Sequence, residues 1–202
     1  MRRKTFDLIA AAGGAVLTVM LVAAGALGLW ANSWTNTNVH NQLAEQQISF
    51  PTAAQMAQAK PGTEITPVML PYIQQYAGQQ VLTGPQAEAY ADHFIAEHLK
   101  AMPYGGVYSL VSAASRANPT NATLKAEVTT VFQGTTLRGL LLEAYGFSKF
   151  GQIALVGSIV AFILAGIMLI LSALGFWHFR RTPEDLEFPK SLHQEVKVPA
   201  GV

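Results

Sequence analysis

The sequence predicts an all-α membrane protein in which two transmembrane helices flank a small, mostly helical extracytoplasmic domain. Hydrophobic residues are concentrated in two blocks without a charged residue, Leu8–Ala31 and Phe150–Trp177. Half of the 202 residues are hydrophobic and 12% are charged, about half the usual charged share of a soluble protein. Between the two blocks, apolar residues recur at the spacing of helices rather than of strands. These observations together favour a helical membrane protein.

Both apolar blocks are long enough to cross a bilayer. A helix needs about 20 residues to span roughly 30 Å of hydrocarbon, and inside lipid a helix satisfies all of its own backbone polar groups. Arg2, Arg3 and Lys4 before the first block also resemble the start of a secretory signal. The apolar core of a signal usually has about 7–15 residues, so we expect this longer block to remain as an anchor.

Basic residues flank the two predicted spans on one side. Arg2, Arg3 and Lys4 precede the first span, and Arg180 and Arg181 follow the second. Such residues favour the cytoplasmic side, so we expect a plasma-membrane protein with both termini in the cytoplasm. The predicted parts are the cytoplasmic N-terminus 1–7, the first span 8–31, the extracytoplasmic domain 32–149, the second span 150–179 and the cytoplasmic tail 180–202.

The predicted outer domain consists of short pieces followed by helices. Its first part is divided by prolines and contains an extended piece before Pro51 and a brief helix over 71–77. The clearest helix covers 85–102, because proline suits the first helical position and Pro103 ends the run. Two more helices are expected, one over 107–117 and one from about Thr120. The last could continue into the second span, although three glycines weaken that expectation: Gly134, Gly139 and Gly146.

Composition excludes several classes of function. The formal net charge of +1 provides no field that would attract nucleic acid. Without cysteine the chain has no disulfide, iron–sulfur cluster or thiolate zinc site. Neither span has an ionisable residue in its interior, which disfavours an ion channel or a proton pump.

The best candidate for a metal site is His93, Glu97 and His98, in the helix over 85–102. Metalloprotease helices place two histidines four residues apart so that both reach one ion. Here the histidines are five apart, about 140° around the helix, so we predict no metal site and a solvated face. Glu88 and Asp92 could form a carboxylate pair, but we predict no catalytic residue and no cofactor.

Small residues in the two spans are candidates for helix packing. Gly157, Ala161 and Ala165 recur every four residues in the second span, and the first span contains Gly14 and Gly28. Such spacing lets helix backbones approach closely in lipid. The stripe could bind other membrane helices, or it could pack the two spans against each other; both interpretations remain open.

Several short motifs carry a resemblance to a known family. They are Ala77-Gly78-Gln79-Gln80-Val81, Gly84-Pro85, Tyr90-Ala91, Ile95, His98, Gly105-Gly106 and Thr136–Leu141. Their order is similar to a set of small actinobacterial membrane proteins with two spans around an outer domain. Members are often labelled aromatic ring-opening dioxygenases, a label that implies an iron site of two histidines and a carboxylate. The architecture is also similar to accessory subunits of actinobacterial respiratory complexes.

These observations lead to two expectations of function. The first is a non-catalytic accessory or structural subunit of a larger membrane complex, such as a respiratory one, with other integral membrane proteins or its own copies as partners. The alternative is an extracytoplasmic module that binds or senses a small ligand, between the helix with Tyr90 and Phe94 and the loop with Tyr72 and Tyr76.

Overall fold

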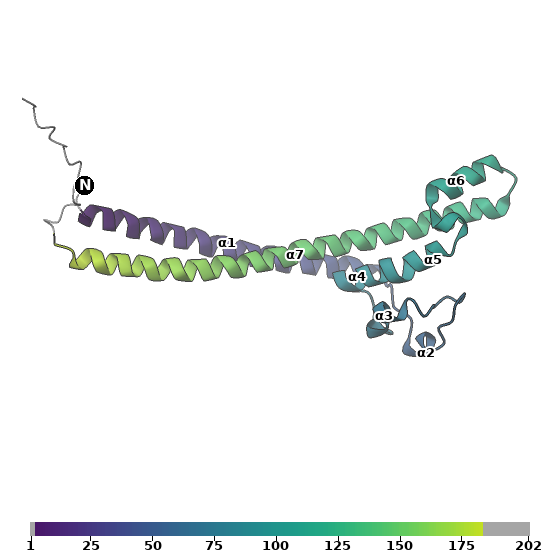
Figure 1. Ribbon diagram of the computed structural model, residues 1–202, viewed down its shortest axis with the longest axis horizontal. Helices are drawn as coiled ribbons and strands as arrows, with labels where there is room; N and C mark the ends of the chain where they lie inside the picture. Colours follow the sequence, from purple (N-terminus) through teal and green to yellow (C-terminus); the bar gives the residue numbers. More distant parts are fainter. Residues whose placement is uncertain (1–2, 184–202) are drawn as a thin grey trace, which may run out of the picture. The chain divides into compact units, whose positions relative to one another are not determined.

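The computed structural model describes residues 3–183 and confirms the predicted all-α fold (Figure 1). Along the chain, two long helices flank a middle region of short helices. The elements in chain order are α1 (Arg3–Gln46), α2 (Ala53–Met56), α3 (Leu70–Ile73), the 3-10 turn Gln74–Tyr76, α4 (Gly84–Tyr90), the π-turn Ala91–Ile95, α5 (Ala96–Lys100), the 3-10 turn Pro103–Gly106, α6 (Tyr108–Ala117) and α7 (Ala122–Arg181).

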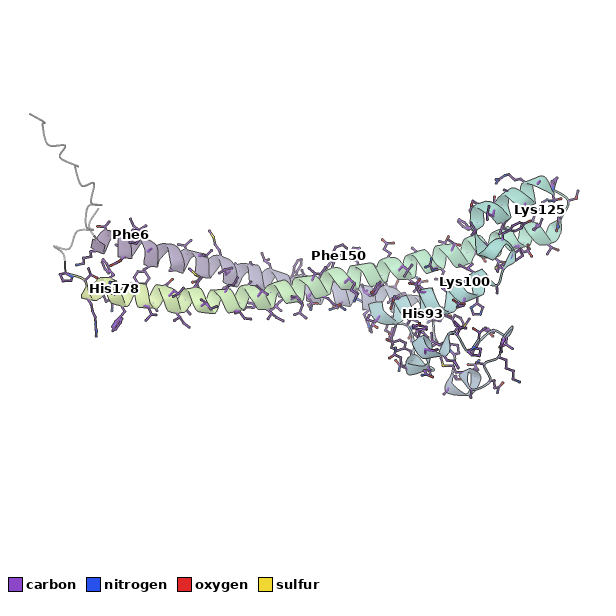
Figure 2. All side chains as sticks on the ribbon, viewed as in Figure 1. Phe6, His93, Lys100, Lys125, Phe150 and His178 are labelled. Atoms are coloured by element: carbon purple, nitrogen blue, oxygen red, sulfur yellow. The ribbon has the colours of Figure 1, made fainter. Side chains whose placement is uncertain are left out.

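Helices α1 and α7 suggest membrane insertion with two spans. Each contains an 18-residue stretch of high hydropathy, and only 17% and 11% of these two stretches are buried within the described residues. A core helix of a soluble protein would instead be covered by its neighbours. The exposed apolar side chains of α7 include Phe150, which Figure 2 labels, and Ile153.

The described chain divides into two compact units. One unit contains residues 3–28 and 157–183, and the other contains Leu29–Val156.

In the first unit, α1 and α7 pack through small residues. Gly14 lies so close to Ser172 that a side chain there would collide with its hydroxyl, and Gly25 is covered by the ring of Phe162. Gly175 packs against Ala11 in the same way. The absence of side chains therefore brings the two backbones close enough for dense van der Waals contact.

The second unit has the apolar core of the middle region. Ile73, Val81 and Ala87 are fully buried there, together with Leu141 from α7. An isolated antiparallel bridge joins Ser49 to Gln80, which confirms the extended piece predicted before Pro51. The core fixes the short segments around the N-terminal half of α7, although few of them are long enough to be stable alone.

The clearest predicted helix is present but is not uniform. The hydroxyl of Thr83 accepts a hydrogen bond from the Gln86 N–H and so caps α4, and the Thr83 N–H donates to Oε1 of Gln86. The chain then widens into the π-turn Ala91–Ile95 before α5 ends the run at Lys100. The prediction of one regular α-helix over 85–102 is therefore wrong in its middle.

Both long helices extend beyond the predicted spans. The polar stretch after Ala31 stays helical to Gln46, because Val39 and Leu43 are four residues apart and both are buried in the unit. Helix α7 runs without a break through Gly134, Gly139 and Gly146. Of these, Gly134 lies against Leu99, where a Cβ would meet the leucine side chain. Packing of this kind offsets the low helix propensity of glycine.

Candidate functional site

The five predicted packing residues occupy different environments. Gly14 and Ala165 are buried within the first unit, whereas Ala161 and Gly28 are half-buried. Gly157 is exposed, and a Cβ built on it would meet no atom within 4 Å. The predicted four-residue stripe thus turns from the exposed side of α7 at Gly157 into the buried seam at Ala165.

The buried seam follows a seven-residue spacing. On α7 of the first unit the buried positions Ser158, Ala165 and Ser172 are seven apart, and Ala11, Thr18 and Gly25 on α1 have the same spacing. This is the repeat that keeps one helix face against its partner. This seven-residue repeat is hard to recognise in the sequence, because its residues are small or hydroxylated. A coiled-coil heptad is usually recognised by large apolar residues.

The candidate residues His93, Glu97 and His98 each have a separate partner in the structure. His93 stacks on Tyr72, with ring centres 3.5 Å apart, and Glu97 pairs with Lys100 at 2.5 Å. The Nδ1 atom of His98 lies 2.7 Å from the backbone oxygen of Phe94. Within residues 3–183, no group of three His, Cys, Asp or Glu residues could hold a metal ion. His93, labelled in Figure 2, therefore has a packing contact instead of a ligand-holding one.

An ion pair joins the π-turn to α7. Nη2 of Arg138 lies 2.6 Å from Oδ1 of Asp92, and both side chains are about one third exposed, at 39% and 34%. The sequence did not reveal this partner, because 46 positions separate the two residues. Asp92, which the sequence allowed as one half of a carboxylate pair with Glu88, is paired in the structure with a cation.

Aromatic rings fill the region where a small ligand was predicted. Phe50 lies 5.2 Å from Tyr76 and 5.3 Å from Tyr90 between ring centres, and Tyr90 lies 4.8 Å from Phe94. Burial raises the pKa of the Tyr90 hydroxyl above 10.0, and the nearby carboxylate of Glu64 raises it further. These rings contact one another, so the space between the Tyr72–Tyr76 loop and the helix is packed.

A smaller pocket in the same unit has Phe94 in its lining. Its volume is ≈ 270 Å³, and its lining includes Glu64, His98, Met102 and Gly134. The pocket combines an apolar wall with one carboxylate and one imidazole, a lining that suits a small amphiphilic ligand.

An apolar groove of ≈ 390 Å³ lies between α1 and α7 in the Leu29–Val156 unit. We call it the α1–α7 groove. Its α1 wall contains Trp34, Asn38, Gln42 and Gln46. Its α7 wall contains Leu137, Leu140, Ala144 and Phe147. Leu140 and Phe147 are 59% and 46% exposed, so the groove is open to an occupant.

A second exposed apolar surface surrounds α6, which folds back beside the first turns of α7 (Figure 1). Val111 and Val131 are buried within this hairpin. Five large apolar side chains in and next to this hairpin are exposed, and we refer to them together as the α6 patch: Tyr104, Val107, Tyr108, Leu110 and Phe132. Tyr104 adopts a left-handed backbone with φ 55°, a conformation that a bulky residue seldom adopts.

Comparison of the chain with protein-family models, with curated proteins and with solved structures found no match.

Proposed function

We propose that this chain is a non-catalytic integral membrane protein that serves as an accessory subunit of a larger membrane complex. In this proposal both termini lie in the cytoplasm, and the middle region lies outside the plasma membrane. The subunit supports assembly or stability of the complex through contacts with other membrane proteins. The resemblance of the sequence to accessory subunits of respiratory complexes favours a respiratory complex as the larger assembly.

The observation that carries the proposal is the exposed apolar surface outside the predicted spans. Leu110 and Phe132 in the α6 patch are 51% and 54% exposed, and Leu140 in the α1–α7 groove is more exposed still. Large apolar patches on a protein that faces water are usually covered by a partner. Two such patches in one small region support a docking role for it.

The distribution of charged groups supports a role without catalysis. Asp92 is paired with Arg138, and Glu97 is paired with Lys100. A general acid or base needs a titratable group that faces a reacting atom inside a cleft. In the α1–α7 groove the lining has a single ionisable side chain, Glu143.

The proposal is tested by purification of the tagged chain from native membranes in a mild detergent, at its native level of expression. We expect a particle well above the 21.7 kDa of the chain, with the same partner subunits in each preparation. Leu110→Lys should weaken this association, since it places a charge in the α6 patch. Ala113→Lys is the matched control, because Ala113 is exposed on the same helix outside the patch.

Two results would contradict the proposal. One is a chain that purifies alone in several mild detergents and forms no cross-links to other proteins in intact membranes. The other is an association that Leu110→Lys and Ala113→Lys weaken equally, because the patch would then have no special part in it.

A second candidate function is the binding of a small ligand in the pocket beside Phe94. The favouring observation is that Glu64 and His98 line one apolar pocket of ≈ 270 Å³. Purified protein can be extracted with organic solvent and the extract analysed by mass spectrometry. One bound compound per chain, lost in Gly134→Leu, would favour this candidate over the subunit.

A further inference from the structure

The two walls of the α1–α7 groove have the residue spacing of helix-packing surfaces. Trp34, Asn38, Gln42 and Gln46 are each four residues apart and form one ridge of α1. On α7, Leu137, Leu140, Ala144 and Phe147 follow steps of three, four and three residues. The first spacing is that of a packing ridge, and the second is that of a coiled-coil seam.

These walls flank residues that are already buried between α1 and α7. Val39 and Leu43 on α1 and Leu141 on α7 form the floor of the groove. The exposed ridges on either side continue for about three helical turns, or roughly 18 Å along α1. A trough between two helices, of this length and with such ridges, has the shape that a third helix fills.

We propose that the α1–α7 groove binds one helix of a different membrane protein, which carries an apolar stripe and a Lys or Arg opposite Glu143. This inference rests on the proposed function, since it names the class of partner and the surface that receives it.

The position of the groove indicates that its occupant comes from the membrane. Trp34 stacks on Trp30, with ring centres 6.3 Å apart, where the apolar block of α1 ends. Phe147 at the corresponding part of α7 is followed by Phe150 and Ile153, which are 69% and 67% exposed. Aromatic residues of this kind gather where a span meets the membrane surface. The apolar surface of α7 thus continues from the span into the groove, where a helix leaving the bilayer would meet it.

The polar groups of the groove favour a helix over a phospholipid. Asn38, Gln42 and Gln46 have uncharged carboxamides, and Asn38 donates to the Trp34 backbone oxygen at 2.8 Å, which leaves its own oxygen to accept a hydrogen bond. The lining has no basic side chain that could bind a lipid phosphate. An anionic headgroup would instead be repelled by Glu143, whereas a basic residue on a helix would be attracted to it.

The same carboxylate argues against a second copy of this chain. Two copies in one membrane have the same orientation, so a two-fold axis through the groove would bring Glu143 close to its counterpart. The nearby cation Lys149 does not line the groove: its Nζ lies 5.1 Å from the centre of the Tyr145 ring and 3.3 Å from Oε1 of Gln152. Self-pairing would therefore place two carboxylates together without a cation.

The test is site-specific photo-cross-linking in intact membranes, with a benzophenone amino acid in place of Leu140. We expect an adduct to another membrane protein, mapped by mass spectrometry to an apolar helical segment with a Lys or Arg within one turn. The same probe at Gln42, on the opposite wall, should reach the same segment. Gly139 is the control, because it is exposed, lies outside the lining and has no atom within 4 Å of a built Cβ.

The charge requirement is tested on the same adduct. Glu143→Lys is expected to lower the adduct yield from the Leu140 probe by roughly fivefold, as loss of one modest ion pair would, and Glu143→Gln by less. Lys149→Gln should leave the yield unchanged.

Several outcomes would overturn the inference. The first group consists of an adduct with lipid, an adduct with a second copy of this chain, and no adduct from the probe at position 140 or 42. The second group consists of equal adduct yields from positions 139 and 140, and a yield that does not change when Glu143 is replaced. In each of these cases a purified complex with other subunits would still support the proposed function. A chain without any partner subunit would instead overturn the proposed function itself.

Discussion

At the scale of single residues, ring contacts determine how the middle region packs. Tyr90 is central, because it contacts both Phe50 and Phe94. Aromatic pairs at such distances contribute about 0.5–1.5 kcal/mol beyond their buried area. The helical spacing of Tyr90 and Phe94 predicted one apolar face. The alternative ligand site also placed the loop with Tyr72 and Tyr76 beside this face, but Phe50 was not anticipated, since ring contacts between distant segments depend on the tertiary fold.

The raised pKa of Tyr90 predicts a pH dependence of stability. Above pH 10.0, the ordinary pKa of the group, the unfolded chain releases this proton more readily than the folded chain does. The stability that the Tyr90 hydroxyl contributes to the folded state is therefore present below pH 10 and is lost as pH rises through the higher pKa of the folded state. We expect the melting temperature in detergent to fall between pH 9 and 11, and to fall less in Tyr90→Phe. The exposed Tyr104 supplies the control: if Tyr104→Phe reduces the fall as much, the effect does not come from Tyr90.

At the scale of elements, sequence patterns predicted which helices form better than where they end. Proline and glycine signals correctly bounded α6, and proline at the first helical position correctly marked the start of α4. The length of α1 was not predicted, because the residues after Ala31 are polar and have weak helix propensities. The continuation of α7 into the second span was only one possibility, since its glycines also have weak helix propensities. The π-turn also depends on the tertiary fold, in which Arg138 binds Asp92 and Tyr72 stacks on His93.

Two adjacent glycines of α1 allow a direct test of helix packing. A Cβ at Gly14 would collide with Ser172 on α7, whereas a Cβ at Gly13 would meet nothing within 4 Å. Gly14→Leu should therefore force the helices of this unit apart and destabilise the protein by about 1–3 kcal/mol, as overpacking does. Gly13→Leu should insert equally well and keep the stability of the wild type. The measurement is heat-induced loss of the monodisperse peak in size-exclusion chromatography, and equal losses in both variants would contradict the packing described here.

At the scale of the whole molecule, the two units have different kinds of apolar surface. In the unit of residues 3–28 and 157–183, the small-residue seam is occupied by α1 and α7 themselves, so it is not free for other helices. In the Leu29–Val156 unit, apolar side chains remain exposed in the α1–α7 groove and in the α6 patch. Composition predicted the two spans, because a bilayer imposes a length and an apolar character on a helix. It could not predict the groove, which depends on α1 and α7 continuing side by side beyond the apolar blocks.

The proposed topology makes a last prediction about which residues face the outside of the cell. Basic residues at Arg2–Lys4 and Arg180–Arg181 favour cytoplasmic ends, so the middle region should be accessible from outside. The chain has no cysteine, and single cysteines can therefore be introduced without background. We expect an impermeant maleimide added to intact cells to label Ser112→Cys in α6 and to leave Ser191→Cys unlabelled until the cells are opened. Ser191 lies outside the described residues and serves only as a marker of the tail. Labelling of Ser191→Cys alone in intact cells would mean that the chain is inserted in the opposite orientation, and labelling of both would mean that it does not cross the membrane twice. In the first of these cases the groove and the α6 patch would have to find their partners on the cytoplasmic side of the membrane.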